Sequence, residues 1–195
     1  METSTKIDFD FLDDVINKVF TSTRQPNFVA GGAVYDLLDG NTPKDVDCFI
    51  NAFSREEHNM FAERLSKEFT FVKHLGPEED YRQGNEYIYG VSEYDYKGKP
   101  IQLISYTREG SYPFIQSVMS KFDFGICRAA YLGYNRVYES QFRSLDRLNR
   151  TLTLRYMQTP HQFMSSHKRL EKLLKKYPGY DFDMNLQDYR EPDQA

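Results

Sequence analysis

The feature that most constrains this chain is a diglycine turn followed, fourteen residues later, by two aspartates. Residues 31–47 read Gly-Gly-Ala-Val-Tyr-Asp-Leu-Leu-Asp-Gly-Asn-Thr-Pro-Lys-Asp-Val-Asp. The preceding residues, 27–30, predict a short strand, and residues 33–38 predict the beginning of a helix. Because glycine lacks a Cβ atom and tolerates unusual φ angles, backbone N–H groups in this turn can approach a triphosphate.

The two aspartates stand at positions i and i+2 of an apolar run. Side chains alternate along a strand, so Asp45 and Asp47 should share one face while Val46 and Cys48 turn to the core. Two carboxylates on one face can hold a divalent metal ion. An Asp-x-Asp pair taken alone is more often a solvated strand end, and the preceding glycine string at its spacing favours the metal site.

Composition favours one folded domain with a helical extension. The chain has 195 residues, of which 39% are hydrophobic and 15% aromatic, so it can bury a sizeable core. Cys48 and Cys127 each lie in an apolar run, which indicates buried free thiols in a reducing compartment, with a disulfide as the alternative. The beginning of the chain lacks the form of a signal peptide, and no apolar run approaches the roughly 18 residues of a membrane span. We therefore expect a cytoplasmic protein without membrane contact, in the host cytoplasm if the source is a virus.

Charge is unevenly distributed. The net charge is −4. Residues 141–180 carry nine basic and two acidic side chains, which gives +7 there and leaves −11 elsewhere. Such a run has two interpretations, a solvated helix face or a surface that contacts phosphates of RNA or of a triphosphate.

Periodicity predicts alternating helices and short strands. Helices are expected at residues 7–22, from the Ser54 capping box to about residue 69, from Pro113 through Ser120, and from Pro160 to Tyr177. Strands are expected at residues 70–73, 87–96, 101–106 and 122–131. The apolar stripe of the last helix should dock on the preceding domain, and its lysines, Lys168, Lys172, Lys175 and Lys176, should stay outside.

Three segments resemble the head domain of tRNA nucleotidyltransferases and bacterial poly(A) polymerases, in the polymerase-beta-like superfamily. Residues 31–47 are similar to the signature GG-x-VRD-x-LLG-x-x-x-KD-x-D. Residues 102–112 read Gln-Leu-Ile-Ser-Tyr-Thr-Arg-Glu-Gly-Ser-Tyr and resemble EVTTFR-x-EG-x-Y. Residues 121–131 read Lys-Phe-Asp-Phe-Gly-Ile-Cys-Arg-Ala-Ala-Tyr and resemble RRDFTINAMAY. The segments occur in the family's order.

The resemblance implies an α/β (α+β) nucleotidyltransferase fold, a small mixed sheet flanked by helices. It divides the chain into a stand-alone, divergent head domain at 1–155, a basic C-terminal helix at 156–180 and a loose tail at 181–195. These boundaries are expectations that the three-dimensional structure can test.

The resemblance also implies a chemistry. Asp45 and Asp47 are the expected catalytic ligands of Mg²⁺, or of Mn²⁺, in a two-metal transfer from an NTP such as ATP. The Gly31-Gly32 turn would face the β- and γ-phosphates, and Lys44 or Arg108 would neutralise charge on pyrophosphate. Asp123 is a further candidate for substrate binding, with a structural carboxylate as its alternative.

Departures from the family pattern change these expectations. Tyr35 and Phe122 replace arginines, Cys127 replaces an asparagine, and Thr107 occupies an arginine position. Gln102 falls where the family has a third acidic residue. Specific CCA addition is not expected at this chain length.

Two functions follow. The first is metal-dependent transfer of a nucleoside monophosphate to a hydroxyl of RNA, a protein or a small molecule. The second is a degenerate domain that binds nucleotide, nucleic acid or a protein partner without turnover, as a viral accessory or inhibitor protein would.

Overall fold

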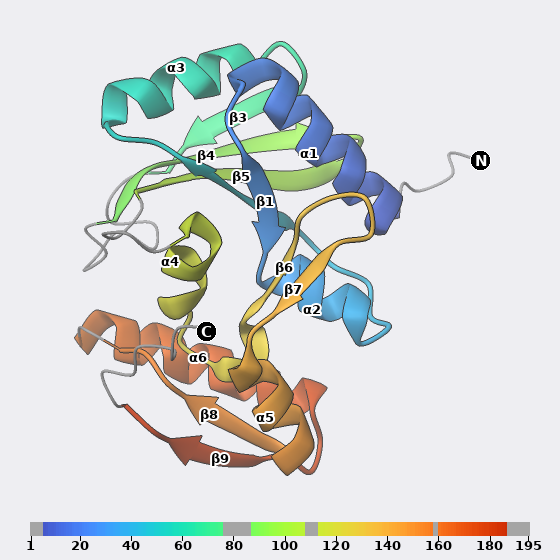
Figure 1. Ribbon diagram of the computed structural model, residues 1–195, viewed down its shortest axis with the longest axis vertical. Coiled ribbons are helices and arrows are strands. Elements are labelled where there is room, and N and C mark those ends of the chain that lie inside the picture. Colours follow the sequence, from blue (N-terminus) through green and yellow to red (C-terminus); the bar gives the residue numbers. More distant parts are fainter. Residues whose placement is uncertain (1–5, 76–86, 108–112, 158–159, 187–195) are drawn as a thin grey trace.

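A mixed sheet with helices on both faces forms the larger part of the molecule (Figure 1). The computed structural model describes residues 6–75, 87–107, 113–157 and 160–186. Within these ranges the sheet has seven strands in the order β3-β4-β5-β2-β1-β6-β7, and its only parallel pairing joins β2 to β5. The strands are β1 (Asn27–Ala30), β2 (Val46–Asn51), β3 (Thr70–His74), β4 (Ile88–Tyr96), β5 (Lys99–Tyr106), β6 (Ala129–Tyr131) and β7 (Val137–Glu139).

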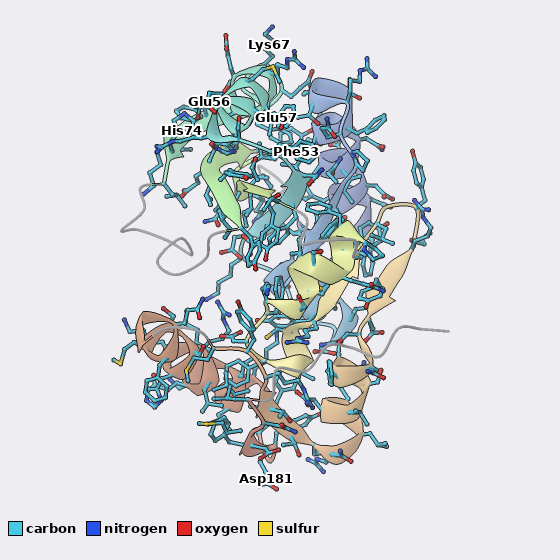
Figure 2. The ribbon with its side chains drawn as sticks, turned by 60° about the vertical axis from the view of Figure 1, so that its left-hand side comes forward. Phe53, Glu56, Glu57, Lys67, His74 and Asp181 are labelled. Carbon is cyan, nitrogen blue, oxygen red and sulfur yellow. The ribbon has the colours of Figure 1, made fainter. Side chains whose placement is uncertain are left out.

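Two amphipathic helices cover one face of the sheet. Helices α1 (Phe9–Thr23) and α3 (Arg55–Leu65) contribute Leu12, Val15 and Phe61 to the main core. Ser54 caps α3 by accepting from the Glu57 N–H at 3.2 Å, while the Glu57 carboxylate accepts from the Phe53 N–H at 2.8 Å. Figure 2 labels Phe53 and Glu57 together at the start of this helix. The capping box predicted from the sequence is therefore present, although the helix ends four residues earlier than expected.

The opposite face carries a second apolar cluster and the short helix α4 (Phe114–Ser120). Phe28 of β1, Phe49 of β2 and Ile104 of β5 point to this side, together with Val118 of α4. Strand β2 alternates as predicted, since Val46 and Cys48 are fully buried in the first cluster while Asp47 and Phe49 lie on the second side. Cys48 and Cys127 are buried free thiols, as expected.

A third layer is built by the C-terminal part of the chain. It contains α5 (Gln141–Asn149), β8 (Thr151–Leu154), α6 (Pro160–Lys176) and β9 (Asp181–Met184), and Figure 1 shows it below α4 and α2. Strand β9 pairs in parallel with β8, so residues 181–184 belong to the folded structure rather than to a loose tail. The Asp181 N–H, which donates to the Arg150 carbonyl at 2.9 Å, starts this pairing.

The continuous strand predicted at 122–131 is wrong. Only residues 129–131 join the sheet, after an isolated bridge at Phe124 and a 3₁₀ turn at Gly125–Cys127. The cause is Asp146 of α5, whose carboxylate accepts from the Ile126 N–H at 2.9 Å and would lie 2.7 Å from a Cβ atom at Gly125. The sequence pattern did not reveal this distant carboxylate, and α5 itself was not predicted.

No helix in the described ranges is both long and apolar enough to span a bilayer.

Candidate functional site

A cavity of about 450 Å³ separates the sheet from α6. Its walls come from the diglycine turn, the two aspartates, an apolar part of the second cluster, and cations of α4 and α6. The lining includes Gly31, Gly32, Tyr35, Asp45, Asp47, Phe49, Ile88, Ile104, Tyr106, Val118, Lys121, Phe122, Cys127, Ser165, Lys168, Arg169, Lys172, Leu173 and Lys176. Four of the residues singled out in the sequence, Gly31, Gly32, Asp45 and Asp47, therefore lie together.

The diglycine turn connects β1 to α2 (Gly32–Leu38). Its Gly31 has a positive φ angle that is strained for residues other than glycine. Gly31 has φ +75° and ψ −134°, and its carbonyl accepts from the N–H groups of Val34 and Tyr35 at 3.1 Å. A Cβ atom at Gly31 would lie 3.9 Å from Asp47 Oδ2, and one at Gly32 would lie 4.0 Å from Asp45 Oδ1. The turn thus runs directly beside both carboxylates, as a joint phosphate and metal site requires.

The two aspartates are in different environments. Asp45 is exposed just before β2, whereas Asp47 is partly buried between Ala30 and Gln102 of the neighbouring strands. The pKa of Asp47 is raised to about 7, first by burial and then by the charge of Asp45, while Arg169 opposes the shift. Among the described residues, neither carboxylate forms an ion pair with a basic side chain.

The donor set fits a hard divalent cation. Besides the two carboxylates, Gln102 Oε1 is buried and has no hydrogen-bond partner among the described residues. Gln102 pairs in register with Asp47, so both side chains stand on the same face of the sheet. Carboxylate and amide oxygens are ligands that Mg²⁺ and Mn²⁺ accept. Within the described ranges, no three acidic, histidine or cysteine side chains converge, so the acidic part of the site is this pair.

Helix α6 places basic side chains opposite the aspartates. Lys168, Lys172 and Lys176 line the cavity at successive spacings of four residues, which puts them on one stripe of the helix. Lys168, Lys172 and Lys175 are exposed, as expected, whereas Lys176 is half-buried, so the expectation that all four lysines stay outside is wrong for Lys176. Lys168 and Lys172 are exposed and also line the cavity. The sequence left a solvated face and a phosphate-contacting surface as alternatives for this helix.

Asp123 holds α6 in place. Its Oδ1 accepts from Arg169 at 2.6 Å and from the Phe124 N–H at 3.0 Å, and its Oδ2 accepts from the Ser166 hydroxyl at 2.8 Å. Asp123 is buried and is not part of the cavity lining. Direct contact of this carboxylate with a substrate remains a prediction.

Further contacts join α6 to α2. Lys176 forms an ion pair with Asp36, and its Nζ lies 4.1 Å from the centroid of the Tyr35 ring. The Tyr177 hydroxyl donates to Asp39, which also pairs with the buried Arg143 at 3.0 Å. The helix that begins at the diglycine turn is thus tied to the C-terminal layer.

The structure does not place two other candidates at the cavity. Lys44 is exposed in the bend before Asp45 and is absent from the cavity lining. Arg108 lies outside the described residues. Their roles toward pyrophosphate stay predictions.

Solved structures with a similar fold include larger CCA-adding and tRNA-processing enzymes. A CCA-adding enzyme in complex with ATP superposes with a TM-score of 0.60 at 18% identity, covering 91% of this chain and 40% of that one. The Thermotoga maritima CCA-adding enzyme with tRNA gives 0.58 at 18%, covering 92% and 40%, respectively. A CTP complex of the Bacillus stearothermophilus enzyme gives 0.55 at 16%, covering 93% and 41%. This chain spans about two-fifths of their length and has a nucleotidyltransferase fold, as the resemblance implied.

Sequence comparison gives the family. None of the curated proteins matches the chain. Residues 4–150 match the Gabija anti-defense 2 (Gad2) family of proteins, which is most of the chain and includes the glycine turn, both aspartates and Asp123. The protein therefore belongs to the Gabija anti-defense 2 family.

Proposed function

We propose that this protein transfers a nucleoside monophosphate from an NTP to a hydroxyl acceptor with the help of Mg²⁺ or Mn²⁺. The observation that carries the proposal is the convergence of the diglycine turn with Asp45 and Asp47 in one cavity. Its volume of about 450 Å³ is within the range of roughly 300–1,000 Å³ that small-molecule sites occupy.

Each wall of the cavity has a part in this reaction. Asp45 and Asp47 would hold the metal, with Gln102 Oε1 as an adjacent neutral donor. The bound metal supplies charge stabilisation for the attacking and leaving oxygens of the displacement. The N–H groups of the glycine turn bind phosphate oxygens, and the apolar wall around Phe49 and Ile104 shelters the nucleoside.

A 3′ hydroxyl of RNA is the acceptor we favour. One structure that shares the fold is described as complexed with tRNA, which supports this class of acceptor. Hydroxyls of a protein or a small molecule are the other acceptors that the chemistry allows, and the comparisons give them no support. This chain spans about two-fifths of the length of the CCA-adding enzymes, so we do not extend the proposal to CCA addition.

The family name adds a biological setting. It describes anti-defense proteins directed at Gabija. We propose that this protein counteracts Gabija defense and that nucleotidyl transfer is the activity by which it does so.

A second candidate is binding without turnover. It is favoured by Gln102, which occupies the place of the third acidic residue in the resembled family and leaves an acidic pair. In this case the protein would counteract Gabija as a nucleotide-binding or protein-binding inhibitor, and its two aspartates would be dispensable for counteracting Gabija.

Labelled transfer separates the two candidates. Each of four α-³²P-labelled NTPs is incubated with the protein, Mg²⁺ or Mn²⁺, and either total cellular RNA or total cellular protein. We expect metal-dependent label on RNA with the wild type and none with Asp45→Asn/Asp47→Asn. Protection from Gabija that persists in this double variant, together with no label on any acceptor, would favour the binding candidate.

A further inference from the structure

Two lysines of α6 share the cavity with the aspartates and have no acidic partner in the described part of the chain. Lys168 and Lys172 are one helical turn apart, both line the cavity, and neither forms an ion pair with a described carboxylate. Two other cations of the same helix already form ion pairs, Arg169 with Asp123 and Lys176 with Asp36. The cavity therefore holds two unbalanced cations in addition to the unbalanced carboxylate pair.

The helix that carries these lysines is held firmly against the fold. Arg169 and Ser166 bind Asp123, Lys176 binds Asp36, and Leu173 is 1% exposed in the third apolar cluster. Lys168 and Lys172 project from this anchored segment, so little backbone ordering is needed when they bind an anion. Lys121, from the end of α4, adds a further cation to the lining of the same cavity.

The cations of α6 stand where the head domain lacks positive charge. Tyr35 and Phe122, which replace arginines of the resembled family, both line the cavity. Lys176 covers the Tyr35 ring, and Arg169 is bound to Asp123, the neighbour of Phe122. A helix distant in the sequence thus places a cation beside each of the two positions that lack the family's arginine.

We propose that Lys168 and Lys172 bind the β- and γ-phosphates of the nucleotide, so that the protein recognises its substrate through the triphosphate chain. The inference rests on the proposed function for the identity of the nucleotide. A triphosphate would suit both the aspartate pair and the lysine pair. Its oxygens would bind the two lysines and also a metal ion held by the aspartates. An RNA backbone is a less suitable occupant of the cavity. The exposed Lys175, which could extend a surface for RNA, is not part of the cavity lining that contains Lys168 and Lys172.

The test measures binding rather than turnover. Calorimetry with inorganic tripolyphosphate is carried out in EDTA on an Asp45→Asn/Asp47→Asn background, where neither metal nor carboxylate repulsion contributes. We expect Lys168→Gln/Lys172→Gln to weaken tripolyphosphate binding by about tenfold or more, because each lysine provides a charge-assisted hydrogen bond. Lys168→Arg/Lys172→Arg, which keeps both charges, should restore most of the affinity.

A matched control removes two charges elsewhere. Lys67→Gln/Lys175→Gln changes the net charge equally, and both of these lysines are exposed outside the cavity. Figure 2 labels Lys67 at the end of the molecule opposite Asp181 and the C-terminal layer. We expect this control to change tripolyphosphate binding by less than about twofold, since neither lysine lines the cavity and both charges are exposed to screening by salt. Thermal unfolding of every variant establishes that the fold is kept.

Three outcomes would overturn the inference. The first is an equal loss of tripolyphosphate affinity in the control, and the second is unchanged tripolyphosphate affinity in Lys168→Gln/Lys172→Gln. The third is a loss of affinity only for a 20-nucleotide RNA with a 5′ hydroxyl, which would assign the two lysines to the acceptor. The proposed function fails separately. Wild-type protein that binds tripolyphosphate through these lysines but never transfers label would keep the inference and remove the transferase.

Discussion

The two walls of the cavity are encoded in opposite ways. The aspartate wall lies within seventeen consecutive residues, 31–47, and its geometry follows from a tight turn and the alternation of one strand. The lysine wall lies on α6 and reaches the same cavity through Asp123, Asp36 and the buried Leu173. A site whose residues are adjacent in the sequence can be recognised from the sequence alone, whereas a site completed by tertiary contacts cannot.

The difference also separates chemistry from scaffolding. Removing a member of the aspartate wall should lower reactivity without unfolding the protein, because these side chains border a cavity. Removing a buried and paired charge of the C-terminal layer, such as Arg143, should lower stability. The predictions below test this distinction.

The largest effect is expected for the aspartates. Asp45→Asn and Asp47→Asn should each lower nucleotidyl transfer by about 10³-fold or more, since each removes several kcal/mol of metal-dependent stabilisation. Label transfer measures the rate and thermal unfolding measures the fold. Turnover at the wild-type level in either variant would contradict the assignment of this wall to the chemistry.

Arg143 tests the opposite region. It is fully buried and donates to Glu139 at 2.7 Å, to Asp39 at 3.0 Å and to the Ile126 carbonyl at 2.5 Å. Arg143→Ala should lower the free energy of unfolding by about 3–5 kcal/mol, because it leaves partly buried acceptors without a donor. Urea denaturation gives the value.

Arg147 is the control for this measurement. It lies 3.9 Å from the same Glu139, and its side chain is 50% exposed. Arg147→Ala should cost less than about 1 kcal/mol. Similar losses in both arginine variants would mean that burial does not decide stability in this layer.

Asp47 also gives a pH dependence. Its pKa is about 7 in the fold against an ordinary 3.8, so its contribution to stability is complete below pH 3.8 and is lost as pH rises through 7. Between pH 5 and 8 the metal-free wild type should lose roughly 2–3 kcal/mol more than Asp47→Asn. Urea denaturation in EDTA at both pH values measures this. A parallel loss in both proteins would show that Asp47 is not the titrating group.

Not all of this arrangement was hidden in the sequence. The capping box at Ser54, the alternation of β2 and the strands β4 and β5 are local patterns and were predicted. The break at Gly125 was missed, because it depends on the Asp146 carboxylate, twenty residues away in the chain. Strand β9 was missed for a related reason, since it pairs with β8, which lies before the whole of α6 in the chain.

The same distinction between local patterns and distant contacts applies to the residues of the candidate site. Gly31, Gly32, Asp45 and Asp47 could be named because a turn and one strand fix their relation. For Lys168, Lys172 and Lys176 the sequence left open a solvated face or a phosphate-contacting surface, since no local pattern shows whether a lysine lines a cavity. Asp123 was found as a candidate, but its contacts with Ser166 and Arg169 depend on how α6 docks.

A smaller effect is expected at Gln102, beside Asp47. Gln102→Glu should tighten Mn²⁺ binding by about tenfold, because a third carboxylate joins the donor set. The same variant should be less stable without metal, since its new charge is partly buried beside Asp47. Calorimetric Mn²⁺ titration and urea denaturation in EDTA test the two parts. An unchanged Mn²⁺ affinity would place Gln102 outside the metal site.

Mn²⁺ binding to the wild type tests the central claim most directly, because it asks whether the aspartates and a nucleotide form one metal site. Electron paramagnetic resonance measures free Mn²⁺ in titrations with and without a non-hydrolysable NTP. We expect tighter binding when the nucleotide is present, since phosphate oxygens complete the coordination, and no such gain in Asp45→Asn/Asp47→Asn. Equal Mn²⁺ affinity of the two proteins under both conditions would contradict it.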